Sequence, residues 1–179
     1  MGYRHSRDEI VAATAATALE SGVGALTFRR VAERLGISDR MVVYYLPSKA
    51  DLILAAATAL TESLQGLLTD AFGDERRSAE QLARVAWPTL TTPEADRVFA
   101  VYLEVIGLAS AGAIPYDRLA PALLGGWLDW LADRVDAPDA DERRRVALGV
   151  IAQIDGLLLV RQVLGADAAH AAATALGVA

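Results

Sequence analysis

Residues 27–52 gather side chains whose chemistry suits binding to a nucleic acid. Arginine guanidinium groups hydrogen-bond guanine edges, and we predict this contact for Arg29 and Arg40. Val43 is predicted to touch a thymine methyl group. Hydroxyl and ammonium groups bind backbone phosphates, and the candidates of this kind are Thr27, Tyr44, Tyr45 and Lys49. The neighbouring Asp39 and Met41 complete the predicted DNA-binding set.

Two short helices joined by a tight turn are needed to position these side chains. Thr27 is a predicted N-cap, and the helix that follows is expected to end at Leu35. Gly36 then suits a left-handed conformation that stops this helix. Ser38 is predicted to cap a second helix, which runs from Asp39 to about Leu46. A helix 10–12 Å wide fits the DNA major groove, so this arrangement predicts a helix-turn-helix.

The second short helix is expected to have one buried face and one exposed face. Val42, Tyr45 and Leu46 can pack on the neighbouring helices. The outward positions are Asp39, Arg40, Val43 and Tyr44. Because solvated helix faces are usually richer in Lys and Glu, an outward face with valine and tyrosine favours a partner.

The bulk composition indicates an all-α chain with an uneven charge. Of 179 residues, 54% are hydrophobic, and alanine and leucine dominate. The absence of cysteine excludes disulfides and thiolate metal sites. A net charge of −6 argues against a nucleic-acid partner for the chain as a whole. However, residues 1–49 hold seven Lys and Arg against five Asp and Glu, so the acidity belongs to residues 50–179.

Targeting and membrane signals are weak in this sequence. The first ten residues lack the apolar segment of a secretory signal. The most apolar run, Val146–Val160, contains Gln153 and Asp155 and is shorter than the roughly 20 residues that span a bilayer. We therefore expect a cytoplasmic protein with no membrane partner.

Periodicity, caps and breaks predict about nine helices in total. Helix starts are indicated by Ser6, Ser48, the Ser78–Gln81 capping box, Thr92 and Asp139. The helix expected at 116–135 could form one piece or two pieces divided around Pro121 and Gly125–Gly126. The expected ranges are 6–21, 27–35, 39–46, 49–72, 78–90, 92–110, 116–135, 138–164 and 167–176. The buried stripe of the fourth helix is predicted to hold Leu52, Ile53, Ala56, Leu60, Leu64 and Leu67.

The first 50 residues resemble the tetracycline-repressor (TetR) family of bacterial transcription regulators. The resemblance rests on Gly22, Leu26-Thr27, Val31-Ala32, Leu35-Gly36-Ile37-Ser38, Tyr45-Leu46 and Pro47-Ser48-Lys49-Ala50-Asp51-Leu52. Ile154-Asp155-Gly156-Leu157 is a second, weaker match. The chain departs from the family's usual pattern, which has Gly, Tyr and Phe at the positions of Arg40, Val43 and Leu46.

The resemblance implies an all-α fold with a helix-turn-helix domain at residues 1–48. A helical ligand-binding and dimerisation domain is then expected at residues 49–179. It also implies a repressor that binds a palindromic operator in double-stranded DNA as a homodimer. The departures at Arg40 and Val43 predict an operator sequence that differs from those of relatives.

A homodimer built on the last two helices is implied by the family, and the sequence supports it independently. The predicted interface stripe contains small residues that allow close approach and is widened by Leu158 and Leu159. Its members are Val146, Gly149, Val150, Gln153, Gly156, Leu157 and Val160. The alternative is a central helix that is buried within one subunit.

The family also implies a pocket for a small-molecule effector of unknown identity, with no cofactor and no metal. The aromatic candidates are Trp87, Phe99, Tyr102, Trp127 and Trp130, and the polar candidates are Glu104 and Asp155. Each of these aromatic residues taken alone is more often part of a protein core than of a ligand site. Gln153 and Asp155 could line this site or fix the register of a dimer.

Two other functions were weighed against a DNA-binding regulator. An enzyme is disfavoured because the chain has two distant histidines, His5 and His170, and no zinc-protease or phosphate-loop pattern. A helical ligand-binding or interaction protein that has lost DNA binding is favoured by the low basicity and by Val43. Dimerisation and ligand binding without DNA binding would identify that alternative.

Overall fold

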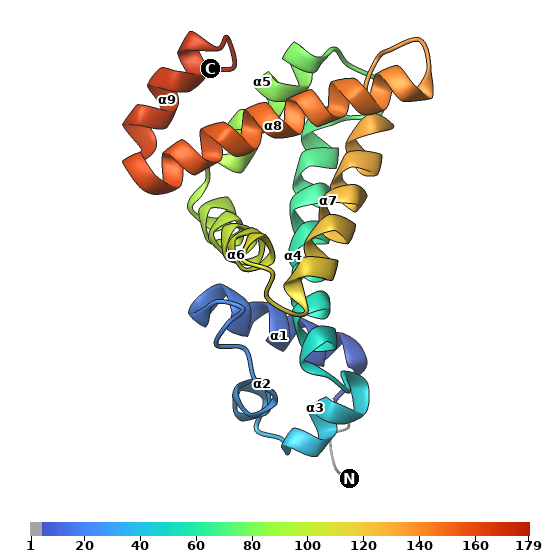
Figure 1. Ribbon diagram of the computed structural model, residues 1–179, viewed down its shortest axis with the longest axis vertical. Helices are drawn as coiled ribbons and strands as arrows, with labels where there is room; N and C mark the ends of the chain where they lie inside the picture. Colours follow the sequence, from blue (N-terminus) through green and yellow to red (C-terminus); the bar gives the residue numbers. More distant parts are fainter. Residues whose placement is uncertain (1–4) are drawn as a thin grey trace. The chain divides into compact units, whose positions relative to one another are not determined.

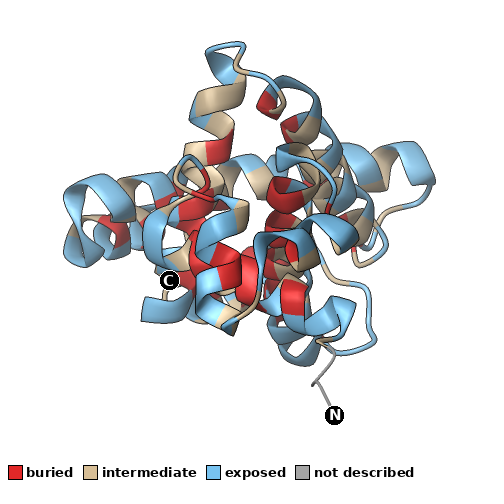
Figure 2. Cartoon of the chain, turned by 90° about the horizontal axis from the view of Figure 1, so that it is seen from below, coloured by how far each residue is buried: buried red, intermediate tan, exposed pale blue. Residues whose placement is uncertain are grey.

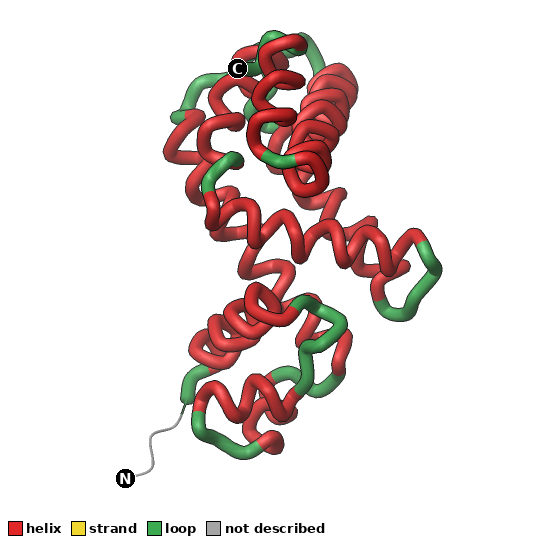
Figure 3. The backbone as a smooth tube through the Cα atoms, turned by 90° about the vertical axis from the view of Figure 1, so that its left-hand side faces the viewer, coloured by secondary structure: helices red, strands yellow, loops and turns green. Residues whose placement is uncertain are grey.

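The computed structural model describes residues 5–179, which fold into nine helices, so the all-α prediction is confirmed (Figure 1). Figure 3 shows these helices in red, joined by short green connections. They are α1 (Arg7–Ser21), α2 (Phe28–Leu35), α3 (Asp39–Tyr45), α4 (Lys49–Phe72), α5 (Ala79–Leu90), α6 (Pro93–Ser110), α7 (Tyr116–Ala132), α8 (Ala140–Leu164) and α9 (Ala166–Ala175).

The contacts within the chain group it into two compact units. Unit 1 holds the residues up to Ser63 together with Ala100–Leu123. Unit 2 holds Leu64–Phe99 and Leu124–Ala179. Helices α4, α6 and α7 each contribute residues to both units. Each unit is therefore made of two separate segments of the sequence.

In unit 1, α1 begins and packs as its sequence predicts. Ser6 and Glu9 form a capping box, in which each side chain bonds the other residue's backbone N–H. Ile10 is fully buried, and the rest of the buried face consists of alanine and threonine. The buried hydroxyl of Thr14 donates to the Ile10 carbonyl at 2.7 Å, so this hydroxyl has a hydrogen-bond partner within its own helix. Small side chains thus let α1 lie close to α2 and α3.

In unit 2, α8 packs against α5 on one side and against α9 near its end. Ser78 and Gln81 form the predicted capping box of α5, and Asp139 caps α8. The core between these helices is made of small and aliphatic side chains. It includes Leu82, Ala83, Ala86, Ala147, Val150, Ile154, Leu157 and Leu158. Figure 2 colours buried positions of the chain red.

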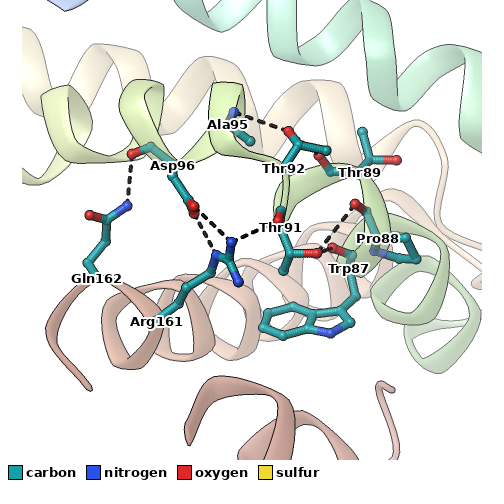
Figure 4. Close-up of polar contacts among 9 residues, drawn as sticks. All are labelled: Trp87, Pro88, Thr89, Thr91, Thr92, Ala95, Asp96, Arg161 and Gln162. Atoms are coloured by element: carbon teal, nitrogen blue, oxygen red, sulfur yellow. Dashed lines mark hydrogen bonds and ion pairs between the residues drawn. The ribbon is translucent and has the colours of Figure 1, made fainter. Parts of the chain in front are cut away.

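A polar cluster fixes the C-terminal part of α8 to the start of α6 (Figure 4). The Arg161 guanidinium donates to both carboxylate oxygens of Asp96 and to the Thr91 carbonyl. The Gln162 side chain donates to the Asp96 carbonyl at 2.8 Å. The hydrogen bond to Asp96 raises the pKa of Arg161 above its ordinary value. Two successive residues of α8 thereby hold one residue of α6.

Three sequence predictions of local structure are corrected. Helix α7 continues through Pro121 as one helix and ends at Ala132, because packing outweighs the weak helix propensity of that segment. Leu67 is 44% exposed and Leu68 is buried instead, since the buried stripe of α4 advances in steps of four residues. Ser38 occupies the N-cap of α3, but its side chain makes no capping hydrogen bond.

Two helices among residues 5–179, α4 and α8, are long and apolar enough to cross a bilayer by length and composition alone. Their most apolar 18-residue windows have mean hydropathies of 1.3 and 1.6, and 39% and 28% of these windows is buried. Core helices of water-soluble proteins pass the same test, so this is weak evidence for a membrane segment. The low burial of α8 shows that unit 2 leaves much apolar surface of this helix uncovered.

Candidate nucleic-acid interface

The turn between α2 and α3 is built as the sequence predicts. The Thr27 hydroxyl accepts a hydrogen bond from the Arg30 amide at 3.2 Å and so caps α2. Gly36 ends α2 with φ 66° and ψ 32°, a left-handed conformation that favours glycine. The Ile37 amide then donates to the Ala32 carbonyl at 3.0 Å, which closes the turn. These local bonds fix the path of the chain into α3.

Helix α3 has the predicted buried and exposed faces. Val42 and Leu46 are almost completely buried and hold the helix on unit 1. Asp39 and Arg40 are exposed, as are Val43 and Tyr44, and the Tyr44 side chain is 77% exposed. Met41 and Tyr45 are half-buried. The structure therefore brings Arg40, Val43 and Tyr44 together on the outer face of one short helix.

The tyrosine pair on α3 is ordered by contacts within unit 1. The rings of Tyr44 and Tyr45 meet edge to face, with centroids 5.0 Å apart and planes at 89°. The Tyr45 hydroxyl donates to the His5 carbonyl at 3.2 Å. The Tyr45 hydroxyl thus already has a backbone partner, whereas the Tyr44 ring extends into solvent.

The predicted basic contacts fall into two groups. Arg29 pairs with Glu33 on α2 at 2.7 Å, and this hydrogen bond raises the pKa of Arg29. Lys49 donates to the Gly24 carbonyl at 3.2 Å. By contrast, no carboxylate within residues 5–179 pairs with Arg40, which is exposed. Of the two predicted base contacts, Arg29 has an ion-pair partner, whereas Arg40 has none among residues 5–179.

The N-terminal end of α4 is capped by its own side chains. Ser48 and Asp51 form a capping box there, with the Ser48 amide 2.9 Å from the Asp51 carboxylate and the Asp51 amide 3.1 Å from the Ser48 hydroxyl. A carboxylate thus already occupies this helix end. Its negative charge opposes a phosphate at the same place.

Glu104, a predicted pocket residue, contacts the turn between α1 and α2. Its two carboxylate oxygens accept hydrogen bonds from the Val23 and Gly24 amides, each at 2.8 Å. The Tyr116 hydroxyl donates to the Val23 carbonyl at 3.5 Å. Burial and the nearby Glu104 carboxylate raise the pKa of Tyr116. No local sequence signal indicates these contacts, because about 80 residues separate the partners.

The aromatic candidates for an effector pocket belong to different units. Tyr102 and Glu104 lie in unit 1, whereas Trp87, Phe99, Trp127, Trp130 and Asp155 lie in unit 2. The Trp127 and Trp130 rings meet edge to face with centroids 5.4 Å apart. Trp87 and Phe99 are buried, and Tyr102 and Asp155 are half-buried. A shared pocket for these residues stays a prediction.

Arg134, which was not predicted, lies over the Trp130 ring. Its guanidinium carbon is 3.9 Å from the ring centroid. The group also donates to the Trp130 carbonyl at 2.8 Å and to the Thr69 hydroxyl at 3.1 Å. Burial lowers the pKa of Arg134 below its ordinary value. An arginine one turn after a tryptophan is the sequence signal that could have indicated this contact.

The predicted dimer stripe on α8 is only partly exposed. Val150 and Leu157 are buried within the chain itself, so they are unavailable to a partner. Val146, Gln153 and Val160 are half-buried, while Gly149 and Gly156 are exposed. The exposed large apolar residues are Leu148, Leu159, Val163 and Leu164. Helical periodicity shows that a stripe is apolar, but it does not show which neighbour covers the stripe.

Residues 10–56 match the family model of bacterial regulatory proteins, tetR family. The N-terminal part of the chain thus resembles the tetR family of bacterial regulatory proteins. The match spans most of α1, the α2–α3 helix-turn-helix and the beginning of α4, so it covers all nine predicted DNA-binding residues. No curated protein matches the chain by sequence.

Several solved structures share the fold over nearly the whole chain. A transcriptional regulator from Rhodococcus sp. Rha1 has a TM-score of 0.73 and 20% identity, over 97% of this chain and 93% of that one. A TetR transcriptional regulator from Legionella pneumophila has a TM-score of 0.71 and 19% identity, over 99% and 97%. The multidrug binding protein EbrR, in complex with imidazole, has a TM-score of 0.69 and 22% identity, over 98% and 92%. These likenesses show that the chain shares the fold of these proteins.

Proposed function

We propose that this protein is a regulator of the TetR family, a ligand-responsive repressor that binds a palindromic operator as a homodimer. The observation that carries the proposal is the outer face of α3, where Arg40, Val43 and Tyr44 are exposed on a helix held by buried Val42 and Leu46. An exposed arginine suits a guanine, an exposed valine suits a thymine methyl, and a tyrosine hydroxyl suits a phosphate. Repression is the usual mode of the family.

The exposed apolar surface of α8 supports the homodimer. Leu148, Leu159 and Val163 lie on one side of the helix, with the small residues Ala152 and Gly156 between them. A contiguous apolar surface of this kind on a helix is typical of a protein–protein interface. The opposite side of α8 is buried on α5, and Arg161 and Gln162 hold its C-terminal part. The exposed side is thus presented on a fixed helix.

A twofold dimer suits a palindromic operator. Two copies of α3 related by the dimer axis would enter successive major grooves, about 34–36 Å apart along the DNA. Each copy would read one half-site. The operator sequence is expected to be particular to this protein, because Arg40 and Val43 depart from the residues usual in the family.

An effector that changes DNA binding is the second part of the proposal. The similar structure of EbrR, a multidrug binding protein, was solved with imidazole. In this chain, Trp127, Trp130 and Arg134 offer aromatic faces and a cation for a small aromatic ligand. Such a ligand changes DNA affinity only if it binds one conformation of the dimer more tightly than the other. The protein would act in the cytoplasm, without a membrane.

The test is a mobility-shift and footprinting assay with the DNA upstream of the protein's own gene. We expect a protected palindrome and an affinity that falls steeply as salt rises. An absence of salt-dependent specific binding to any palindrome would sink the proposal. If the protein dimerises and binds small molecules but no DNA, it is instead a helical ligand-binding protein.

A further inference from the structure

The turn between α1 and α2, residues 22–26, is held by side chains from three other helices. Glu104 of α6 accepts from the Val23 and Gly24 amides, and Tyr116 of α7 donates to the Val23 carbonyl. Lys49 of α4 donates to the Gly24 carbonyl at 3.2 Å. All of these residues belong to unit 1.

The glycines of this turn leave room for the carboxylate of Glu104. A Cβ atom added at Gly24 would lie 2.9 Å from one carboxylate oxygen of Glu104, and one added at Gly22 would lie 2.5 Å from the other. Gly22 also has φ 78°, which disfavours any other residue there. Gly24 has no such backbone requirement, so the carboxylate is the reason that a side chain does not fit.

The contact is strong because the acceptor is charged. A carboxylate that accepts from two backbone amides forms charge-assisted hydrogen bonds, which are stronger than bonds between neutral groups. The replacement of one oxygen by an amide NH₂ would place two donors against each other. Glutamine at this position therefore cannot reproduce both bonds.

The turn leads directly to residues that are predicted to touch DNA. Thr27, the N-cap of α2 and a phosphate candidate, lies three residues after Gly24. Lys49, a second phosphate candidate, is bonded to the Gly24 carbonyl. A shift of Gly24 would therefore move the start of α2 and release the lysine. Helix α2 in turn packs on α3, whose outer face carries Arg40.

We propose that Glu104 is a positioning residue for operator binding: it sets the α1–α2 turn and thereby places Thr27, Lys49 and helix α2 for the DNA. This role rests on the proposed function. Glu104 lies on α6, outside residues 10–56, which match the family model. Glu104 does not itself touch the DNA.

The test is a set of four variants measured on the full-length protein: Glu104→Gln, Glu104→Ala, Gly24→Ala and the double variant Gly24→Ala/Glu104→Ala. The methyl group of Gly24→Ala pushes the carboxylate away, so we expect it to weaken operator binding about 5- to 20-fold, like Glu104→Gln. In the Glu104→Ala background the methyl group enters vacated space. The double variant should therefore bind no more weakly than Glu104→Ala alone.

Two readouts separate positioning from stability. Operator affinity is measured at a temperature where melting curves show every variant to be folded, and affinity for a scrambled DNA is measured beside it. We expect operator affinity to fall further than affinity for the scrambled DNA, because the variants displace α2 and α3 as well as the phosphate candidates Thr27 and Lys49. The matched controls are Glu94→Gln, an exposed glutamate on the same helix, and Gly66→Ala, where an added Cβ meets nothing within 4 Å. Both controls should bind the operator normally.

The outcomes decide between the two proposals. If the unaltered protein binds a palindrome and the Glu104 and Gly24 variants bind it equally well, the role of Glu104 is wrong and the proposed function stands. Lower melting temperatures with unchanged affinities would also overturn it, because Glu104 would then only stabilise the fold. If the unaltered protein binds no palindrome, both proposals fall.

Discussion

Arg161 and Asp96 form a two-pronged ion pair, with distances of 2.6 Å from Nε to Oδ1 and 2.8 Å from Nη2 to Oδ2. The pair joins α8 to the first turn of α6 within unit 2 (Figure 4). The two side chains are 16% and 30% exposed, so solvent screens the pair less than it screens an ion pair on the open surface. The same guanidinium also satisfies the Thr91 carbonyl.

The replacement Arg161→Ala should therefore destabilise the protein. We expect the free energy of unfolding to fall by about 1.5–3 kcal/mol, because hydrogen bonds to a charged group and a carbonyl are lost together. Urea unfolding measures this change. The matched control is Arg145→Ala, which removes an exposed ion pair with Glu142 and should leave the urea midpoint nearly unchanged. Equal shifts for the two variants would show that partial burial of the Arg161 pair adds nothing.

Gly36→Ala should destabilise the helix-turn-helix. Gly36 has φ 66°, and an L-residue with a Cβ costs about 1–2 kcal/mol in this left-handed conformation. A Cβ there meets no atom within 4 Å, so the backbone alone accounts for the cost. Gly36→Asn should cost less, since asparagine tolerates this conformation. Thermal unfolding compares the two variants, and an alanine as stable as glycine would contradict the argument.

Arg40→Ala should change which DNA sequence is bound. If the guanidinium contacts a guanine, its loss costs about 1–3 kcal/mol at one base position and little elsewhere. Binding to operators with single base changes measures this. Lys49→Ala should instead weaken binding to all sequences evenly, both through a lost phosphate contact and through release of Gly24. Losses independent of sequence in both variants would refute the base contact assigned to Arg40.

Charge on the exposed side of α8 should prevent dimerisation. The double variant Leu159→Glu/Val163→Glu places two carboxylates on the surface that we propose as the interface. Sedimentation velocity should show a folded monomer where the unaltered protein is a dimer. The control is Ile114→Glu, which changes an apolar residue that is 82% exposed in the loop between α6 and α7. A dimer that survives the double variant must be built on another surface.

Tyr116 predicts how stability depends on alkaline pH. Burial, followed by the nearby Glu104 carboxylate, raises the pKa of Tyr116 above its ordinary value of 10.0. The unfolded chain therefore loses the phenol proton at a lower pH than the folded protein. The corresponding stability is present below pH 10 and is lost as the pH rises through the folded pKa. Unfolding measured at several alkaline pH values should show a smaller decline in Tyr116→Phe, and an identical decline would exclude this tyrosine as the cause.

Local chemistry made much of the fold predictable from the sequence. The capping of α1 by Ser6 and of α2 by Thr27, and the left-handed stop at Gly36, each depend on residues within a few positions of one another. The outward face of α3 followed from helical periodicity in the same way. Each of these features is encoded where it forms.

Contacts between distant residues were not predictable in this way. Glu104 and the α1–α2 turn are about 80 residues apart, and Arg161 and Asp96 are 65 apart. No periodic pattern indicates which carboxylate will meet which amide or guanidinium group. The apolar pattern of α8 likewise does not separate residues that the chain itself buries, such as Val150 and Leu157, from exposed ones such as Leu159. A pattern of apolar residues does not name the surface that each one meets.

The contact of Glu104 with the α1–α2 turn limits how a chimeric regulator can be built from this chain. A graft that transfers only residues 10–56 onto another body carries the Gly22-Val23-Gly24 turn without its acceptor. Its two amides would then bond water, and the transplanted domain would lose a fixed point beside Thr27. A working chimera should therefore include Glu104 of α6, or it should use a host protein with a carboxylate at the same place. For this chain, the module to be exchanged is discontinuous in sequence.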